Sequence, residues 1–175
     1  IVAVSGALND GLVNLDTRFD CEGGRTFFAG KPLRDDHSFG LISVEEIIGK
    51  SSNIGTFKIA LQLGPERLYK YICAYGFGSV SGISLLGEEN GIVYSPKQWS
   101  KLSISRIPIG QGIAVTPLQM VMAMSAIANG GRLMQPLLID RILDDQGHVL
   151  AKNQPREIRQ VITEPSAKLM VAALK

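Results

Sequence analysis

The sequence lacks the features that mark a zinc, nucleic-acid or membrane-spanning protein. Cys21 and Cys73, its only cysteines, do not have Cys-x-x-Cys spacing, so no zinc site is expected and two buried free thiols are favoured over one disulfide. The net charge is +2 and no stripe of Lys and Arg is present, which argues against a nucleic-acid partner. The most apolar run, Met120 to Ala128, is too short to cross a bilayer. With 45% hydrophobic and 19% charged residues, the 175-residue chain is expected to form one ordinary globular domain.

Two consecutive helices are predicted by their end signals. Ser43 and Glu46 form a Ser-x-x-Glu capping box, which predicts a helix from about Val44 to Gly49. Apolar residues at helical spacing indicate a second helix, and these residues are Ile54, Phe57, Ala60, Leu61 and Leu63. Gly64 ends this second helix, and Pro65 opens the next one.

The junction between the two helices carries the most chemistry in the chain. Lys50-Ser51-Ser52-Asn53 places an ammonium group, two hydroxyls and an amide on one tight turn. These four residues alone favour a purely structural interpretation, in which Ser52 or Asn53 only caps the second helix. A catalytic role for the turn therefore needs support from elsewhere in the chain.

A second polar cluster precedes the junction. Asp35-Asp36-His37 sets two carboxylates beside an imidazole, a combination that can serve metal binding or acid–base chemistry. The surrounding sequence favours a plain polar turn that leads into the helix at Ser43. No metal or cofactor is therefore predicted.

The second half of the chain contains one strongly apolar helix. Thr116 and Gln119 form another capping box, with Pro117 at the first helical position. The helix that follows, Leu118 to Ala128, is apolar almost all round, so we expect it to be buried at the centre of the structure.

The residues after this helix predict a hairpin and a final helix. Leu137 to Leu143 and His148 to Ala151 are rich in strand-forming residues, and Asp144 to Gly147 is a turn between them. Thr163 then caps a last helix. Helical patterns run through both chain ends, so we expect the sequence to be part of a longer protein.

Several of these segments resemble the class B penicillin-binding transpeptidases. Ser51-Ser52-Asn53 is a Ser-x-Asn triplet, one of three motifs of the penicillin-binding proteins and related β-lactamases. The approach from Asp36 through Glu46 is similar to the family's approach to that motif. Gly110 to Gln119 resembles its Gly-Gln-Gly and Thr-Pro-Leu-Gln signature, and the helix ending at Ala128 to Gly131 also fits. The resemblance extends over most of the chain.

The other two family motifs are missing. No Ser-x-x-Lys stands at a suitable place, and no Lys-Thr-Gly occurs anywhere. The chain therefore resembles the stretch between them, a single partial transpeptidase domain over residues 1–175. The resemblance implies a mainly α structure: the helical lobe of the penicillin-binding protein/serine β-lactamase-like transpeptidase fold, whose parent is α+β. We expect a small peripheral hairpin from Leu137 to Ala151 and most of the central sheet to be absent.

The resemblance also implies the chemistry of the Ser-x-Asn motif. In the parent enzyme a serine attacks the D-Ala-D-Ala amide of a peptidoglycan stem peptide, and β-lactams acylate the same serine. Ser51 is then expected to relay a proton to the leaving nitrogen, and Asn53 to hold the motif lysine and the substrate peptide bond. Ser52 points elsewhere or caps the helix, and Gln111 is a structural turn rather than a site residue. Because the nucleophile and its base are missing, the isolated chain is expected to be inactive.

The implied partners are peptidoglycan stem peptides, β-lactam antibiotics, and other cell-wall or division proteins. The implied location is extracytoplasmic, on the periplasmic side of the inner membrane, with the anchor outside this chain. Two alternatives stay open from the sequence. One is a related β-lactam sensor or β-lactamase, and the other is a non-enzymatic helical interaction module in which Ser51 and Asn53 only cap.

Overall fold

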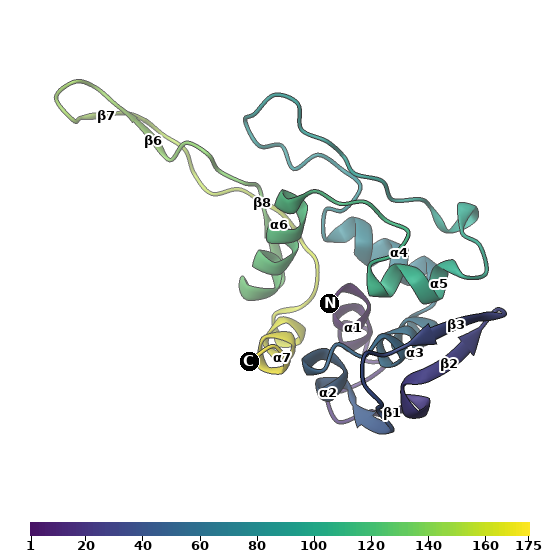
Figure 1. The fold of residues 1–175 in the computed structure, drawn as a ribbon. Helices are drawn as coiled ribbons and strands as arrows, with labels where there is room; N and C mark the ends of the chain where they lie inside the picture. The colour runs from purple at the N-terminus through teal and green to yellow at the C-terminus, as the bar shows by residue number, and fades with distance from the viewer.

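Helices form the centre of the structure and short strand pairs lie around them (Figure 1). The computed structural model describes residues 1–175. The α-helices are α1 (Val2–Asn9), α2 (Val44–Gly49), α3 (Asn53–Leu63), α4 (Pro65–Ala74), α5 (Ser103–Arg106), α6 (Pro117–Ala128) and α7 (Glu164–Ala173). Three 3₁₀ turns accompany them: η1 (Glu22–Gly24), η2 (Pro96–Gln98) and η3 (Ile107–Ile109). None of the helices combines the length and the apolar composition that a bilayer span requires.

The strands form four separate two-stranded antiparallel sheets. The pairs are β1 (Arg18–Asp20) with β4 (Leu41–Ser43), β2 (Arg25–Phe28) with β3 (Lys31–Arg34), β5 (Arg132–Met134) with β8 (Glu157–Gln160), and β6 (Arg141–Leu143) with β7 (Val149–Lys152). The predicted hairpin is confirmed as β6–β7, which extends away from the body (Figure 1). One or two short strands were also expected within Gly11 to Phe28, and β1 and β2 lie there, but the sequence did not predict that three further antiparallel pairs would form. Their strands are only three or four residues long, too short to show a clear alternation in the sequence.

Helix α1 lies at the centre of the core and packs against α3, α4 and α7. Its small residues allow this close approach: Ala3 and Ala7 are buried, and a Cβ at Gly6 would lie 2.6 Å from the Tyr71 ring of α4. The C-terminal end of α1 is tied to the start of α7, because the Thr163 amide donates a hydrogen bond to Asn9 Oδ1 at 2.7 Å. The body that carries the helix junction is therefore firmly packed from several sides.

The predicted helix starts are confirmed by their capping contacts. Ser43 Oγ accepts a hydrogen bond from the Glu46 amide at 3.2 Å, and the Ser43 amide donates to Glu46 Oε2 at 3.0 Å. The Thr116 and Gln119 pair makes the same reciprocal contacts at the start of α6. Thr163 caps α7 as expected. Each of these contacts lies within one helical turn, which is why the sequence pattern was sufficient.

The prediction that α6 is buried all round was wrong. Met122, Ala123, Ala126 and Ile127 face the core, but Val121 on the opposite face is 62% exposed. The helix packs against β5 and α7, and this packing leaves Val121 uncovered. Apolar composition alone does not show which face finds a packing partner.

Candidate functional site

The Ser-x-Asn residues occupy the turn between α2 and α3 (Figure 1). Ser51 has a φ of +53°, a left-handed conformation that is uncommon for a residue with a Cβ. Its side chain is exposed, and its hydroxyl makes no hydrogen bond within the chain. The turn thus presents the Ser51 hydroxyl to solvent.

Ser52 caps the N-terminus of α3, as one interpretation of the sequence proposed. Its side chain is fully buried, and its Oγ accepts a hydrogen bond from the Gly55 amide at 2.9 Å. The same hydroxyl donates to Asp35 Oδ2 at 2.9 Å and lies 3.4 Å from Cys21 Sγ. Because its hydrogen-bonding capacity is used within the chain, Ser52 is not available to a ligand.

Asn53 is the first residue of α3 and is half-buried. Its Nδ2 donates a hydrogen bond to the Arg34 carbonyl oxygen at 2.9 Å, which sets the orientation of the amide plane. This contact uses one amide hydrogen and leaves the Oδ1 acceptor and the second hydrogen free. The amide can therefore accept from a cation and donate to a carbonyl at the same time.

Asp35 is a contributor to this site that the sequence did not reveal. Its Oδ1 accepts a hydrogen bond from the Ile54 amide at 3.0 Å, in addition to the Ser52 contact. The polar-turn interpretation holds for its neighbours: His37 Nε2 lies 3.5 Å from Asp36 Oδ2, and both side chains are largely exposed. No group of three His, Cys, Asp or Glu side chains gathers anywhere to hold a metal. Asp35 and Ser52 are 17 residues apart, so no local pattern could have connected them.

Lys50, beside Ser51, is engaged by other side chains. Its ammonium lies 2.7 Å from Glu46 Oε1 and 5.8 Å from the centre of the Phe39 ring. This ammonium, together with the Ser43 amide, holds the pKa of Glu46 at about 2. The structure therefore pairs Lys50 with Glu46 and brings no lysine amine to Ser51 as a base.

The two thiols are free, as the cysteine spacing favoured. Cys21 is buried, whereas Cys73 is partly exposed rather than buried as expected. Burial raises the pKa of the Cys21 thiol. Cys21 is not a candidate nucleophile for the junction, because a buried thiol with a raised pKa is largely protonated at neutral pH.

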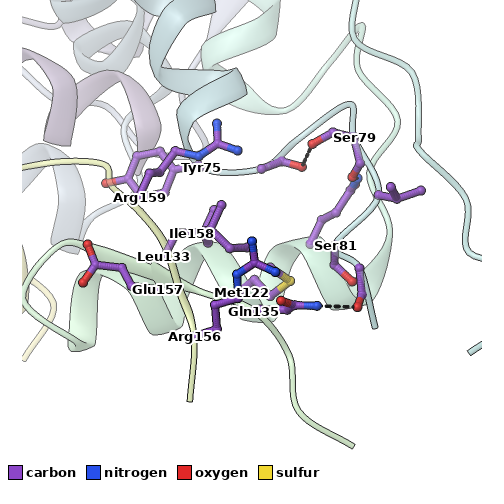
Figure 2. A pocket seen from close by; sticks show the side chains of 14 residues that line it. Tyr75, Ser79, Ser81, Met122, Leu133, Gln135, Arg156, Glu157, Ile158 and Arg159 are labelled. Carbon is purple, nitrogen blue, oxygen red and sulfur yellow. Dashed lines mark hydrogen bonds between the residues drawn. The ribbon is translucent and has the colours of Figure 1, made fainter. Parts of the chain in front are cut away.

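A hollow of about 290 Å³ lies elsewhere, between the segment after α4, helix α6 and strands β5 and β8 (Figure 2). Tyr75, Met122 and Leu133 line its interior, and Arg156 and Arg159 lie along one wall (Figure 2). Ser51 and Asn53 do not line it. The junction is therefore a surface site separate from this hollow.

Comparison with known proteins shows where the chain belongs. The family model of the penicillin binding protein transpeptidase domain matches residues 1–175. Penicillin-binding protein PbpB of Mycolicibacterium smegmatis is 33% identical over 171 residues, which are 97% of this chain and 26% of the relative. Stage V sporulation protein D of Bacillus subtilis is 34% identical over 178 residues, covering 100% of this chain and 28% of the relative.

Solved structures show the same relationship. Penicillin-binding protein 3 of Mycobacterium tuberculosis, complexed with ampicillin, matches with a TM-score of 0.86 and 32% identity over 96% of this chain and 37% of that chain. A peptidoglycan synthetase of Bifidobacterium adolescentis matches with a TM-score of 0.88 and 29% identity over 98% of this chain and 32% of that chain. The chain spans little more than a quarter of its curated relatives and has part of the transpeptidase fold. It belongs to the transpeptidase domain family of the penicillin-binding proteins, with class B penicillin-binding proteins as its relatives.

Proposed function

We propose that this chain is part of a peptidoglycan D,D-transpeptidase, in which Ser51 relays a proton and Asn53 orients the substrate. The observation that carries the proposal is that the three residues of the triplet differ in burial and in hydrogen bonding. Ser52 is buried and fully bonded, whereas Ser51 and Asn53 keep unused polar atoms on an open turn. The left-handed φ of Ser51 follows from the ending of α2, where the Ser52 and Ser51 amides donate to the Ile47 and Ile48 carbonyls, but that ending leaves the Ser51 hydroxyl unbonded and exposed.

The reaction is acyl transfer from a stem peptide through a serine. A serine hydroxyl is a weak nucleophile until a neighbouring base takes its proton. The nucleophile and its lysine base belong to a Ser-x-x-Lys motif, which this sequence lacks, and the strand with Lys-Thr-Gly is also missing. Ser51 passes the proton from that lysine to the nitrogen of the departing D-Ala, since its hydroxyl is both donor and acceptor.

Asn53 supplies two contacts in this arrangement. Its free Oδ1 accepts from the ammonium of the motif lysine, and its remaining amide hydrogen donates to the carbonyl of the substrate peptide bond. The Arg34 carbonyl holds the amide in place without using either of these atoms. Fixed orientation of such a group lowers the entropy lost when the substrate is positioned.

The ligands and the location are proposed from the relatives. The Mycobacterium tuberculosis relative has been solved with ampicillin and with aztreonam, which supports β-lactams as inhibitors that acylate the parent enzyme. We further propose that the parent acts outside the cytoplasm, on the periplasmic side of the inner membrane, anchored by a segment outside this chain. Stem peptides are its substrates, and other cell-wall or division proteins are its partners.

Ser51→Ala in the full-length enzyme tests the relay. Acylation by a labelled penicillin should slow by ~10²–10⁴, the range for loss of a proton-transfer group. Thr116→Ala is the control, because it removes a helix cap outside the junction and should leave acylation unchanged. An unchanged rate in Ser51→Ala returns Ser51 to a structural role.

A second experiment tests the division of the active site between this chain and the rest of the enzyme. The 175-residue chain incubated with a labelled penicillin should show no covalent adduct by intact mass. A protein extended to include Ser-x-x-Lys and Lys-Thr-Gly should become acylated. Stoichiometric labelling of the shorter chain overturns the relay assignment, because it requires a nucleophile within these residues.

A further inference from the structure

Three consecutive junction residues are all bonded to one two-residue segment, Arg34–Asp35 at the end of β3. The Arg34 carbonyl accepts from Asn53 Nδ2 at 2.9 Å. The Asp35 carboxylate accepts from the Ser52 hydroxyl at 2.9 Å and from the Ile54 amide at 3.0 Å. Ser52 caps the Gly55 amide, and Asp35 supplies a second cap from outside the helix, because the Ile54 amide in the first turn of α3 has no partner within the helix.

The Arg34–Asp35 segment is itself fixed to the body of the protein. Leu33, just before it, is 2% exposed and belongs to the hydrophobic core. The Asp35 amide donates to the Gly24 carbonyl at 3.1 Å, and Arg106 of α5 donates to the Pro32 carbonyl at 2.7 Å. The segment can therefore act as a rigid support for the junction, since core packing and hydrogen bonds from two other parts of the chain hold it.

The support acts on the two residues with proposed chemical roles. Ser52 is fully buried and bonded on both sides, so the backbone on the C-terminal side of Ser51 cannot move freely. On the other side, the Ser51 amide donates to the Ile48 carbonyl at 3.1 Å and the Ser52 amide to the Ile47 carbonyl at 3.0 Å, a helix ending that places Ser51 in the left-handed region. A non-glycine residue leaves the left-handed region unless its surroundings hold it there.

We propose that Arg34–Asp35 is the positioning element of the Ser-x-Asn motif. Asp35 acts through Ser52 to hold in place the turn on which Ser51 takes its left-handed conformation, and the Arg34 carbonyl sets the amide of Asn53. The inference rests on the proposed function of Ser51 and Asn53. Asp35 touches no reacting atom, so its effect is on the placement of the relay hydroxyl.

The test uses the full-length enzyme and a fluorescent penicillin, with the limiting acylation rate constant and the initial binding constant measured separately. Asp35→Ala should lower the limiting rate roughly 10- to 100-fold, the loss usual for a small misplacement of a reacting group. The initial binding constant should change little. Asp35→Asn should retain most of the rate, because its oxygen still accepts from Ile54 and its amide donates to the Ser52 hydroxyl.

Asp144→Ala is the matched control. Asp144 is likewise an aspartate whose carboxylate accepts hydrogen bonds from the chain, from the Gln146 and His148 amides at 2.9 and 2.8 Å, but it lies at the tip of the β6–β7 hairpin. Its loss should leave acylation unchanged. The Asp35→Ala and Ser52→Ala changes should not be additive in the limiting rate, since Asp35 acts through Ser52. If Asp35→Ala does not fold, Ser52→Ala carries the test, because it keeps the bond between Asp35 and Ile54.

The outcomes separate this inference from the proposed function. If Ser51→Ala acylates slowly but folded Asp35→Ala has a normal limiting rate, the positioning role is overturned and the relay stays intact. Ser52→Ala is read in the same way if Asp35→Ala does not fold. A normal rate in Ser51→Ala as well overturns the relay. Loss of rate in Asp35→Ala that Asp35→Asn restores supports the positioning role, because a general loss of stability does not change the limiting rate alone.

Discussion

The close contact between α2 and α3 at Gly55 sets the geometry of the junction and can be tested by adding one methyl group. A Cβ at position 55 would lie 2.4 Å from Cγ1 and 2.6 Å from Cδ1 of Ile47. Ile47 is 0% exposed, so its side chain cannot turn outward to make room. Overpacking of this kind costs about 1–3 kcal/mol, and the better helix propensity of alanine offsets about 1 kcal/mol. We expect Gly55→Ala to lower the free energy of unfolding by up to about 2 kcal/mol.

The measurement is urea denaturation at neutral pH, with Gly49→Ala as the matched control. Gly49 is also helical, in α2, but no atom lies within 4 Å of a Cβ at that position. Gly49→Ala should therefore leave stability unchanged or raise it by up to about 1 kcal/mol. If Gly55→Ala is as stable as Gly49→Ala, then α2 and α3 do not approach as closely as the structure indicates.

A double variant identifies the clash partner. Ile47→Ala alone should cost about 2–5 kcal/mol, because it opens a cavity in the core. In the double variant Ile47→Ala/Gly55→Ala, the methyl group added at position 55 no longer clashes with an isoleucine side chain, and it fills part of the cavity. The two changes should therefore cost at least about 1 kcal/mol less together than the sum of the single effects. Simple additivity contradicts a direct contact between the two side chains.

Three other predictions concern single residues. Ser51→Gly should be at least as stable as the original protein by thermal unfolding, and Ser51→Val less stable, because a left-handed φ of +53° costs a β-branched residue most. Thr116→Ala should lower the free energy of unfolding by roughly 1 kcal/mol in the same assay as Gly55→Ala, through loss of an N-cap. Burial raises the pKa of Tyr75 from 10.0 to about 12, against the opposing hydrogen bond to Ser5. Because folded Tyr75 keeps its proton to higher pH than unfolded Tyr75, its contribution to stability is present below pH 10 and is lost as the pH rises toward 12. Denaturation midpoints measured against pH should therefore fall less steeply over this range in Tyr75→Phe.

The sequence by itself determined the local elements and the family. Ser43 with Glu46, and Thr116 with Gln119, mark helix starts through contacts that span three residues, so the pattern contains the whole interaction. The turn at Asp144 to Gly147 is likewise complete within a short segment, and the β6–β7 hairpin followed from it. The Ser-x-Asn triplet and its neighbours were sufficient to identify the transpeptidase relatives.

The tertiary structure alone decided how the junction is supported. Asp35 looked like part of a polar turn, because its partners Ser52 and Ile54 are 17 and 19 residues away. The left-handed φ of Ser51 also has no signature in a residue that usually avoids that region. Val121 on α6 was expected to be buried and is exposed, because composition does not specify which face of a helix is covered. Contacts between residues that are distant in the chain depend on how the elements pack, and one sequence read locally contains no record of that packing.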